Sequence, residues 1–257
     1  MPAHPGAATP RVLVIGIDGV RYGLLAELPT PHPGSIAEAG FLAPVEVDGG
    51  TPTMSGPCRA TILTGVGPAK HGGPTPEAWD ECDEQVTAEA VHVLATCEPE
   101  ASFVHLGAVD ETAHFLGCGP DYRRAVLRAD ERLGRLLAAV RSRKTYASEA
   151  WTVIVVTDHG HVDAGGHGGD TVEERTAWVA CAGPQFAPGR PGGAIGHPDV
   201  AAQVYASLGR PIDPHWTLDG SPFPATEPAG PTPLPAWPRR TPTGYGGLTR
   251  GVIGDTP

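Results

Sequence analysis

The segment WTVIVVTDHGHVDAGGHGG, residues 151–169, is the part of the chain around which the rest is organised. It opens with four apolar residues, 153–156, a run typical of a strand buried on both faces in a parallel sheet. Asp158 and His159 follow the strand, and His167 lies between two glycine pairs. Such donors at the carboxyl end of a strand indicate a metal site, whereas an Asp–His pair that only caps the strand is the alternative. This segment alone leaves the two interpretations near even.

The composition is that of an acidic globular protein. With 257 residues, of which 40% are apolar, the chain can bury a sizeable core despite its 35 glycines and 29 prolines. The net charge of −11 argues against binding a nucleic-acid polymer through a basic surface. We therefore expect no nucleic-acid polymer as a partner.

The cysteines and the amino terminus predict a soluble, cytoplasmic protein. Five cysteines without a Cys-x-x-Cys pair fit neither a disulfide framework nor a cysteine zinc site. The first ten residues lack the pattern of a secretion signal, and the apolar run at 12–17 is too short to span a bilayer. We expect no membrane partner, and the sequence does not determine the oligomeric state.

Two further apolar strands are predicted to lead into aspartates. Residues 11–18, RVLVIGID, end in Asp18, and the strand at 101–108 precedes Asp110 and His114. Asp110 and His114 share a face if a helical turn begins there, a spacing suited to one metal ion. Taken alone, Asp18 also fits the common role of a cap, and a surface pair is the better interpretation of the Asp110–His114 motif. In a doubly wound sheet, however, the carboxyl ends of parallel strands converge on one crevice.

Ser55 stands at the entry of a helix predicted at 57–63. Its hydroxyl either caps that helix or acts as a nucleophile that the positive end of the helix dipole favours. Arg59, one turn further on, either orients an oxyanion or forms a salt bridge. Taken alone, the cap is the better interpretation of this serine.

The remaining patterns complete an α/β fold. Helices are predicted at 35–39, 86–96, 121–143 and 197–208, and strands at 41–47 and 177–182. We expect a doubly wound, mostly parallel central sheet flanked by helices, with no large cap domain. Residues 1–223 are expected to form one α/β domain, and residues 224–257 a Pro-rich tail.

Several motifs, in the same order, resemble the alkaline phosphatase superfamily, closest to its type I phosphodiesterase/nucleotide pyrophosphatase branch. They are VLVIGIDGVR (12–21), TPTMSGPCRATILTGVGPAKHG (51–72), FVHLGAVDETAHFLG (103–117), TVIVVTDHGH (152–161), GGHGG (165–169) with EERTAW (173–178), and a last pair within 199–223. The resemblance implies an alkaline phosphatase-like core and a two-metal hydrolase that cleaves a small-molecule or nucleotide phosphate ester through a phosphoseryl intermediate.

The resemblance also implies roles for single residues. Asp18, Asp158 and His159 match the ligands of the zinc that also binds the nucleophile. Asp110, His114 and His167 match the ligands of the second zinc. Ser55 falls on the nucleophile position, and Arg59 could support it or the phosphate. The implied cofactors are two divalent ions, Zn²⁺ with Mn²⁺ as the alternative.

Other functions remain open at the level of the sequence. Residues 55–65 also resemble the sulfatase signature, so a sulfatase or phosphonate monoester hydrolase with Ser55 as formylglycine precursor is one alternative. Against it, Gly19 follows Asp18 where sulfatases usually have a second Asp. A non-catalytic metal- or phosphate-binding protein is the other alternative. His161 and His197 are extra candidates for which we expect a supporting or surface role.

Overall fold

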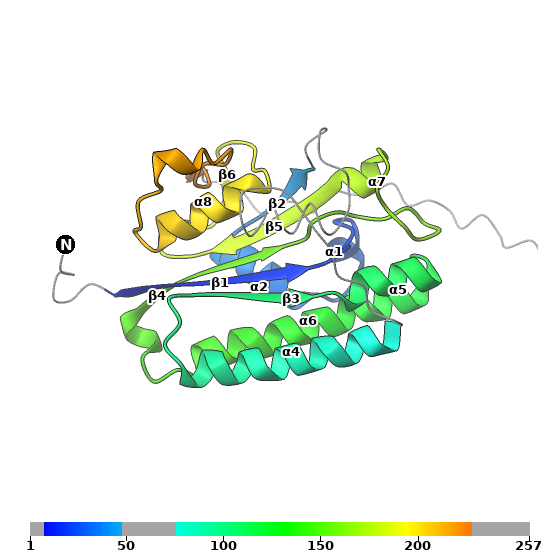
Figure 1. Ribbon diagram of the computed structural model, residues 1–257, viewed down its shortest axis with the longest axis horizontal. Coiled ribbons are helices and arrows are strands. Elements are labelled where there is room, and N and C mark those ends of the chain that lie inside the picture. The colour runs from blue at the N-terminus through cyan, green and yellow to red at the C-terminus, as the bar shows by residue number, and fades with distance from the viewer. Residues whose placement is uncertain (1–7, 48–75, 228–257) are drawn as a thin grey trace, which may run out of the picture.

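The computed structural model describes residues 8–47 and 76–227, which form a central sheet with helices on both faces (Figure 1). The sheet has five strands in the order β2-β5-β4-β1-β3. In chain order they are β1 (Thr9–Ile17), β2 (Gly40–Glu46), β3 (Ala101–Leu106), β4 (Glu149–Val156) and β5 (Thr176–Ala182). β1 pairs in parallel with β3 and β4, whereas β5 runs antiparallel to β4 and β2. The predicted fold class is thus confirmed, with β5 as the strand of opposite direction.

The helices are divided between the two faces of the sheet. They are α1 (Leu24–Glu27), α2 (Pro31–Ala39), α4 (Pro76–Thr96), α5 (Ala108–Leu116), α6 (Pro120–Arg141), α7 (Val172–Arg175) and α8 (Pro198–Ser207). The long helices α4 and α6 lie side by side under one face, and α8 covers the other (Figure 1). A short pair, β6 (Arg190–Pro191) and β7 (Thr226–Glu227), follows the edge near β2.

Strand β1 has apolar side chains on both of its faces. Leu13 and Ile15 pack into the core under α4 and α6, whereas Val12 and Val14 face the second core, which includes residues of α8. Alternate side chains of a strand point to opposite faces, so both sets must be apolar when both faces are covered. The strand therefore stays buried up to its carboxyl end, where polar residues begin.

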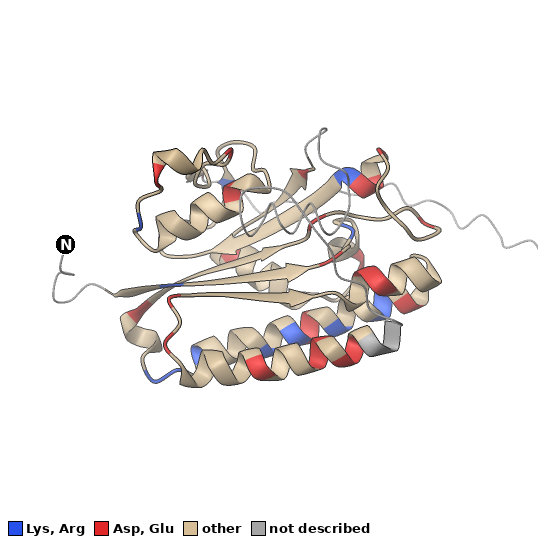
Figure 2. Ribbon diagram, in the orientation of Figure 1, with Lys and Arg blue, Asp and Glu red and all other residues tan. Residues whose placement is uncertain are grey.

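Helix α4 is ten residues longer than the segment 86–96 that the sequence predicts. Its early turns are acidic, and its carboxylates pair with arginines of α6 (Figure 2). Asp80 lies 2.9 Å from Arg132, and Glu84 lies 2.7 Å from Arg135. These pairs stabilise a segment whose apolar pattern is too weak to predict a helix.

Prolines in α2 and β2 stand at positions where a backbone N–H is not needed for pairing. α2 begins at Pro31 rather than at Ser35, because prolines are tolerated in the first turn, where no N–H has an intrahelical acceptor. β2, with Pro44, is an edge strand of the described sheet, a position in which the missing N–H of proline is tolerated. None of the helices in the described ranges combines the length and apolarity that a bilayer crossing requires.

Candidate metal centre

The polar residues that follow β1, β3 and β4 meet at one end of the sheet. Asp18 comes directly after β1, and Asp158 comes two residues after the end of β4. Asp110 lies in the first turn of α5, which begins two residues after β3 ends. The parallel register of the three strands brings these ends together, since Ile17 pairs with Leu106 across β1 and β3.

The first group of donors comprises Asp18, Asp158 and His159, all fully buried. His159 Nε2 lies 3.4 Å from Asp18 Oδ1 and 3.8 Å from Asp158 Oδ2. His159 Nδ1 lies 3.0 Å from the carbonyl of Gly160, so with its proton there Nε2 is left as the donor atom towards the carboxylates. The carbonyl of Gly160 therefore orients the His159 ring in the way that a second hydrogen bond orients a metal-bound histidine.

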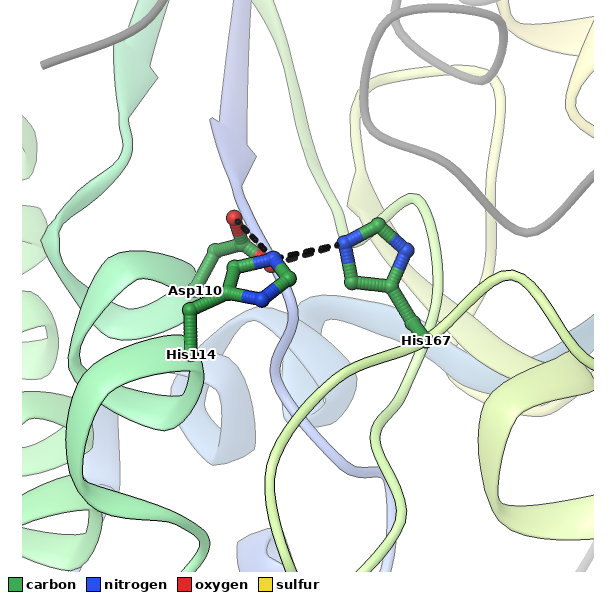
Figure 3. A group of neighbouring side chains, drawn as sticks. All are labelled: Asp110, His114 and His167. Carbon is green, nitrogen blue, oxygen red and sulfur yellow. Dashed lines mark hydrogen bonds and ion pairs between the residues drawn. The ribbon is translucent and has the colours of Figure 1, made fainter.

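The second group comprises Asp110, His114 and His167 (Figure 3). His114 Nε2 lies 3.5 Å from Asp110 Oδ2 and 2.9 Å from His167 Nε2. His167 Nε2 lies 3.5 Å from Asp110 Oδ1. Figure 3 shows His114 on its helix facing His167 across the gap from the glycine loop. Within each group the donor atoms lie within 4.8 Å of one another.

Asp83 of α4 holds the helix that carries Asp110 and His114. Its carboxylate oxygens accept hydrogen bonds from the backbone N–H of Gly107, at 2.9 Å, and of Ala108, at 3.0 Å. Asp83 is 2% exposed, and burial raises the pKa of its carboxyl. The sequence patterns did not single out Asp83, because its partners lie far along the chain.

The loop that carries His167 is held on both sides. On one side, Glu174 accepts a hydrogen bond from the N–H of Gly169 at 2.8 Å. On the other, Gly165 has a φ of +84°, and a Cβ there would lie 2.0 Å from the carbonyl of Ala113 in α5. The close approach of the loop to α5 thus requires glycine, and it brings His167 next to His114.

His161 and His197 are buried, so a surface role is wrong for both. His197 Nε2 lies 3.0 Å from the carbonyl of Thr157, at the end of β4, and burial lowers the pKa of His197 to about 4. His161 Nε2 lies 2.9 Å from Asp110 Oδ1. Burial, together with the neighbouring histidines, lowers the pKa of His161 to about 2, so its ring is neutral.

The donor set fits a divalent cation. Three aspartates, each at most 4% exposed, lie together with imidazoles, and buried carboxylates at such short range repel one another unless positive charge is added. Mixed imidazole and carboxylate donors suit Zn²⁺ or Mn²⁺, whereas Ca²⁺ takes oxygen ligands. The structure therefore brings together all six residues that the sequence proposes as ligands. Ser55 and Arg59, with their predicted helix at 57–63, lie outside the described residues.

Comparisons with known proteins identify the family and the fold of the chain. The model of the type I phosphodiesterase/nucleotide pyrophosphatase family matches residues 12–90 and 74–179. No curated protein matches the chain. Murine ectonucleotide pyrophosphatase/phosphodiesterase 5 is 15% identical, with a TM-score of 0.59 over 78% of this chain and 95% of its own.

Sulfatases share the same fold. A 2-O GAG sulfatase is 12% identical, with a TM-score of 0.58 over 86% of this chain and 76% of its own. A protein solved with its substrate D-glucosamine-2-N,6-O-disulfate is 11% identical, with a TM-score of 0.62 over 85% of this chain and 81% of its own. At these identities the solved structures show a shared fold, while the family match covers most of the chain.

Proposed function

The chain belongs to the type I phosphodiesterase/nucleotide pyrophosphatase family, a family of phosphate-ester hydrolases, and we propose that it works by a two-metal mechanism with Ser55 as nucleophile. One observation carries this proposal: two groups of three donors, Asp18–Asp158–His159 and Asp110–His114–His167, lie together at the carboxyl end of the parallel strands. Two divalent ions, Zn²⁺ or Mn²⁺, would supply positive charge that lowers the pKa of the nucleophile and offsets charge on the phosphate oxygens.

In this mechanism Ser55 attacks phosphorus in line with the leaving oxygen. The P–O bond to the leaving group breaks as the bond to Ser55 Oγ forms, which gives a covalent phosphoseryl intermediate. Water then attacks phosphorus and releases phosphate or a phosphate monoester, and Ser55 regains its proton. We assign Arg59 to the support of the phosphate oxygens, since a guanidinium can bind two of them at once.

We propose a small phosphate ester, including nucleotides, as the substrate. An inactive variant of the murine relative was solved in complex with AMP, which makes nucleotide esters the first compounds to test. The chain's net charge of −11 favours a small ester over a nucleic-acid polymer. Monoesters and diesters are both compatible with the donor groups.

A sulfatase is the second candidate, because a 2-O GAG sulfatase and a putative sulfatase share the fold. The residue after Asp18 argues against it. A Cβ at Gly19 would lie 2.5 Å from His161 Nε2, so this chain has no room for the second Asp that sulfatases usually have there. Mass spectrometry of the peptide that carries Ser55 would decide, since formylglycine would favour the sulfatase.

The direct test is Ser55→Ala, assayed on p-nitrophenyl phosphate, bis-p-nitrophenyl phosphate and p-nitrophenyl sulfate. We expect kcat to fall by at least about a thousandfold while the metal content stays unchanged. Ser148→Ala is the control, because Ser148 is exposed next to the amino end of β4, far from the donor groups. Full activity in Ser55→Ala would rule out its role as nucleophile.

A further inference from the structure

His161 lies inside the candidate metal centre, although it is not one of the six residues matched to metal ligands. It is 0% exposed, and its ring lies edge-to-face with the rings of His114, His159 and His167, with ring centroids 5.2–5.5 Å apart. A buried imidazole needs a partner for each polar nitrogen, because a nitrogen that loses its water without gaining a hydrogen bond or a metal destabilises the fold. Within the described residues, neither nitrogen of His161 makes a hydrogen bond.

The contact between His161 and Asp110 is short but not aligned. Nε2 lies 2.9 Å from Asp110 Oδ1, within hydrogen-bond distance, yet the pair lacks the angle that a hydrogen bond requires. The two atoms therefore lie beside each other rather than pointing at each other. Ligand atoms of one cation are arranged in this way, because bonds of about 2.0–2.2 Å to the metal place neighbouring donors about 3.3–3.6 Å apart at tetrahedral angles and about 2.8–3.1 Å apart at right angles.

We propose that His161 is a further metal ligand, whose Nε2 binds the cation held by Asp110, beside the Nε2 of His159. These three residues are buried, and their donor atoms lie within 4.8 Å of one another, as closely as in the two other groups. The inference rests on the metal centre of the proposed function. It adds a fourth imidazole to the three that the family resemblance implies.

Gly19 leaves the space beside Nε2 that such a bond requires. Its φ of +66° favours glycine, and a Cβ at this position would lie 2.5 Å from His161 Nε2 and 3.1 Å from the Cα of Asp110. Any larger residue at 19 would thus occupy the space into which Nε2 faces. The absence of a side chain at Gly19 therefore matches the position of the His161 ring.

Cadmium NMR on the full chain tests the bond directly. The protein, labelled with ¹⁵N-histidine and loaded with ¹¹³Cd²⁺ alone, should show four histidine nitrogens split by coupling to cadmium. The split signal of His161 should vanish in His161→Gln. His32→Gln is the control that should leave all four signals, because His32 pairs with Asp130 between α2 and α6, apart from the centre.

Three coupled nitrogens in the wild-type protein, with His161 uncoupled, would overturn the inference and leave the proposed function standing. Absence of cadmium binding would overturn both. The number of coupled nitrogens in the wild-type spectrum separates these results even where His161→Gln does not fold, and the variant assigns the fourth signal to His161. Where the variant folds, we expect its affinity for Zn²⁺ to fall about tenfold or more, with His32→Gln unchanged.

Discussion

Replacing Asp83 by alanine should destabilise the protein and weaken its metal binding together. Asp83 reaches from α4 to the start of α5 and accepts two backbone hydrogen bonds, from Gly107 and Ala108. The same helix carries Asp110 and His114 in its first two turns. Removal of the carboxylate leaves two N–H groups at a buried helix start without an acceptor.

The magnitude follows from these two contacts. Hydrogen bonds to a charged group contribute about 1.5–3 kcal/mol each, and loss of a helix cap costs about 0.5–2 kcal/mol. Burial offsets part of this gain, as the raised pKa of Asp83 indicates. We expect Asp83→Ala to lower the free energy of unfolding by about 2–3 kcal/mol. Glu84→Ala is the matched control: Glu84 is exposed and pairs with Arg135, so its loss should cost less than about 1 kcal/mol.

Urea unfolding of the metal-free proteins measures the free energy of unfolding, and competition with a chelator dye measures Zn²⁺ affinity. Equal urea midpoints for Asp83→Ala and Glu84→Ala would refute the capping argument. A destabilised Asp83→Ala protein with unchanged Zn²⁺ affinity would refute the part of the argument in which the cap positions the donors. Asp83→Asn, which keeps one acceptor oxygen, should fall between the wild type and Asp83→Ala.

Two other substitutions test the loop and the pH dependence of stability. Gly165→Ala should lower the free energy of unfolding by about 2 kcal/mol more than Gly166→Ala does. Both glycines have positive φ, but of the two only a Cβ at 165 would meet a carbonyl, that of Ala113. Equal losses in urea unfolding would contradict this. The hydrogen bonds from Arg143 chiefly hold the pKa of Glu149 at about 2, against about 4.5 in the unfolded chain. Because the pKa of Glu149 is depressed in the fold, its stabilisation is present above about pH 4.5 and is lost as the pH falls towards 2. In Glu149→Gln the free energy of unfolding should therefore fall less between about pH 4.5 and about pH 2 than in the wild type. An equal fall in both proteins would contradict this role of Glu149.

The parts of the fold that the sequence predicts are those that one hydrophobic pattern determines. The run 153–156 is apolar throughout because β4 is covered on both faces, and α6 repeats its apolar residues at helical spacing. The direction of β5 has no such signal, since its side chains alternate between two buried faces whichever way the strand runs. The sequence does not predict the first turns of α4, because they depend on ion pairs with α6.

In the candidate site, too, sequence patterns predict some residues, whereas others depend on contacts between distant elements. Asp18 and Asp158 could be predicted because they follow apolar strands whose ends must meet, and His114 because it lies four residues from Asp110. Asp83 could not, since its hydrogen bonds span 24 residues and join separate elements. The sequence predicts only a supporting or surface role for His161, because its position inside the centre depends on the turn after β4 and on the space at Gly19.

Asp110 couples the two donor groups. Its Oδ1 lies 3.9 Å from His159 Nε2, in the fully buried group, and its Oδ2 lies 3.5 Å from His114 Nε2, which is exposed. A cation at His114 would exchange ligands with water, whereas one at His159 would be held by buried side chains. Because one carboxylate faces both groups, loss of a cation from the exposed side changes the charge felt on the buried side. Substitutions at His114 and His159 should therefore not be additive in their effects on metal affinity, whereas independent sites would give additive losses.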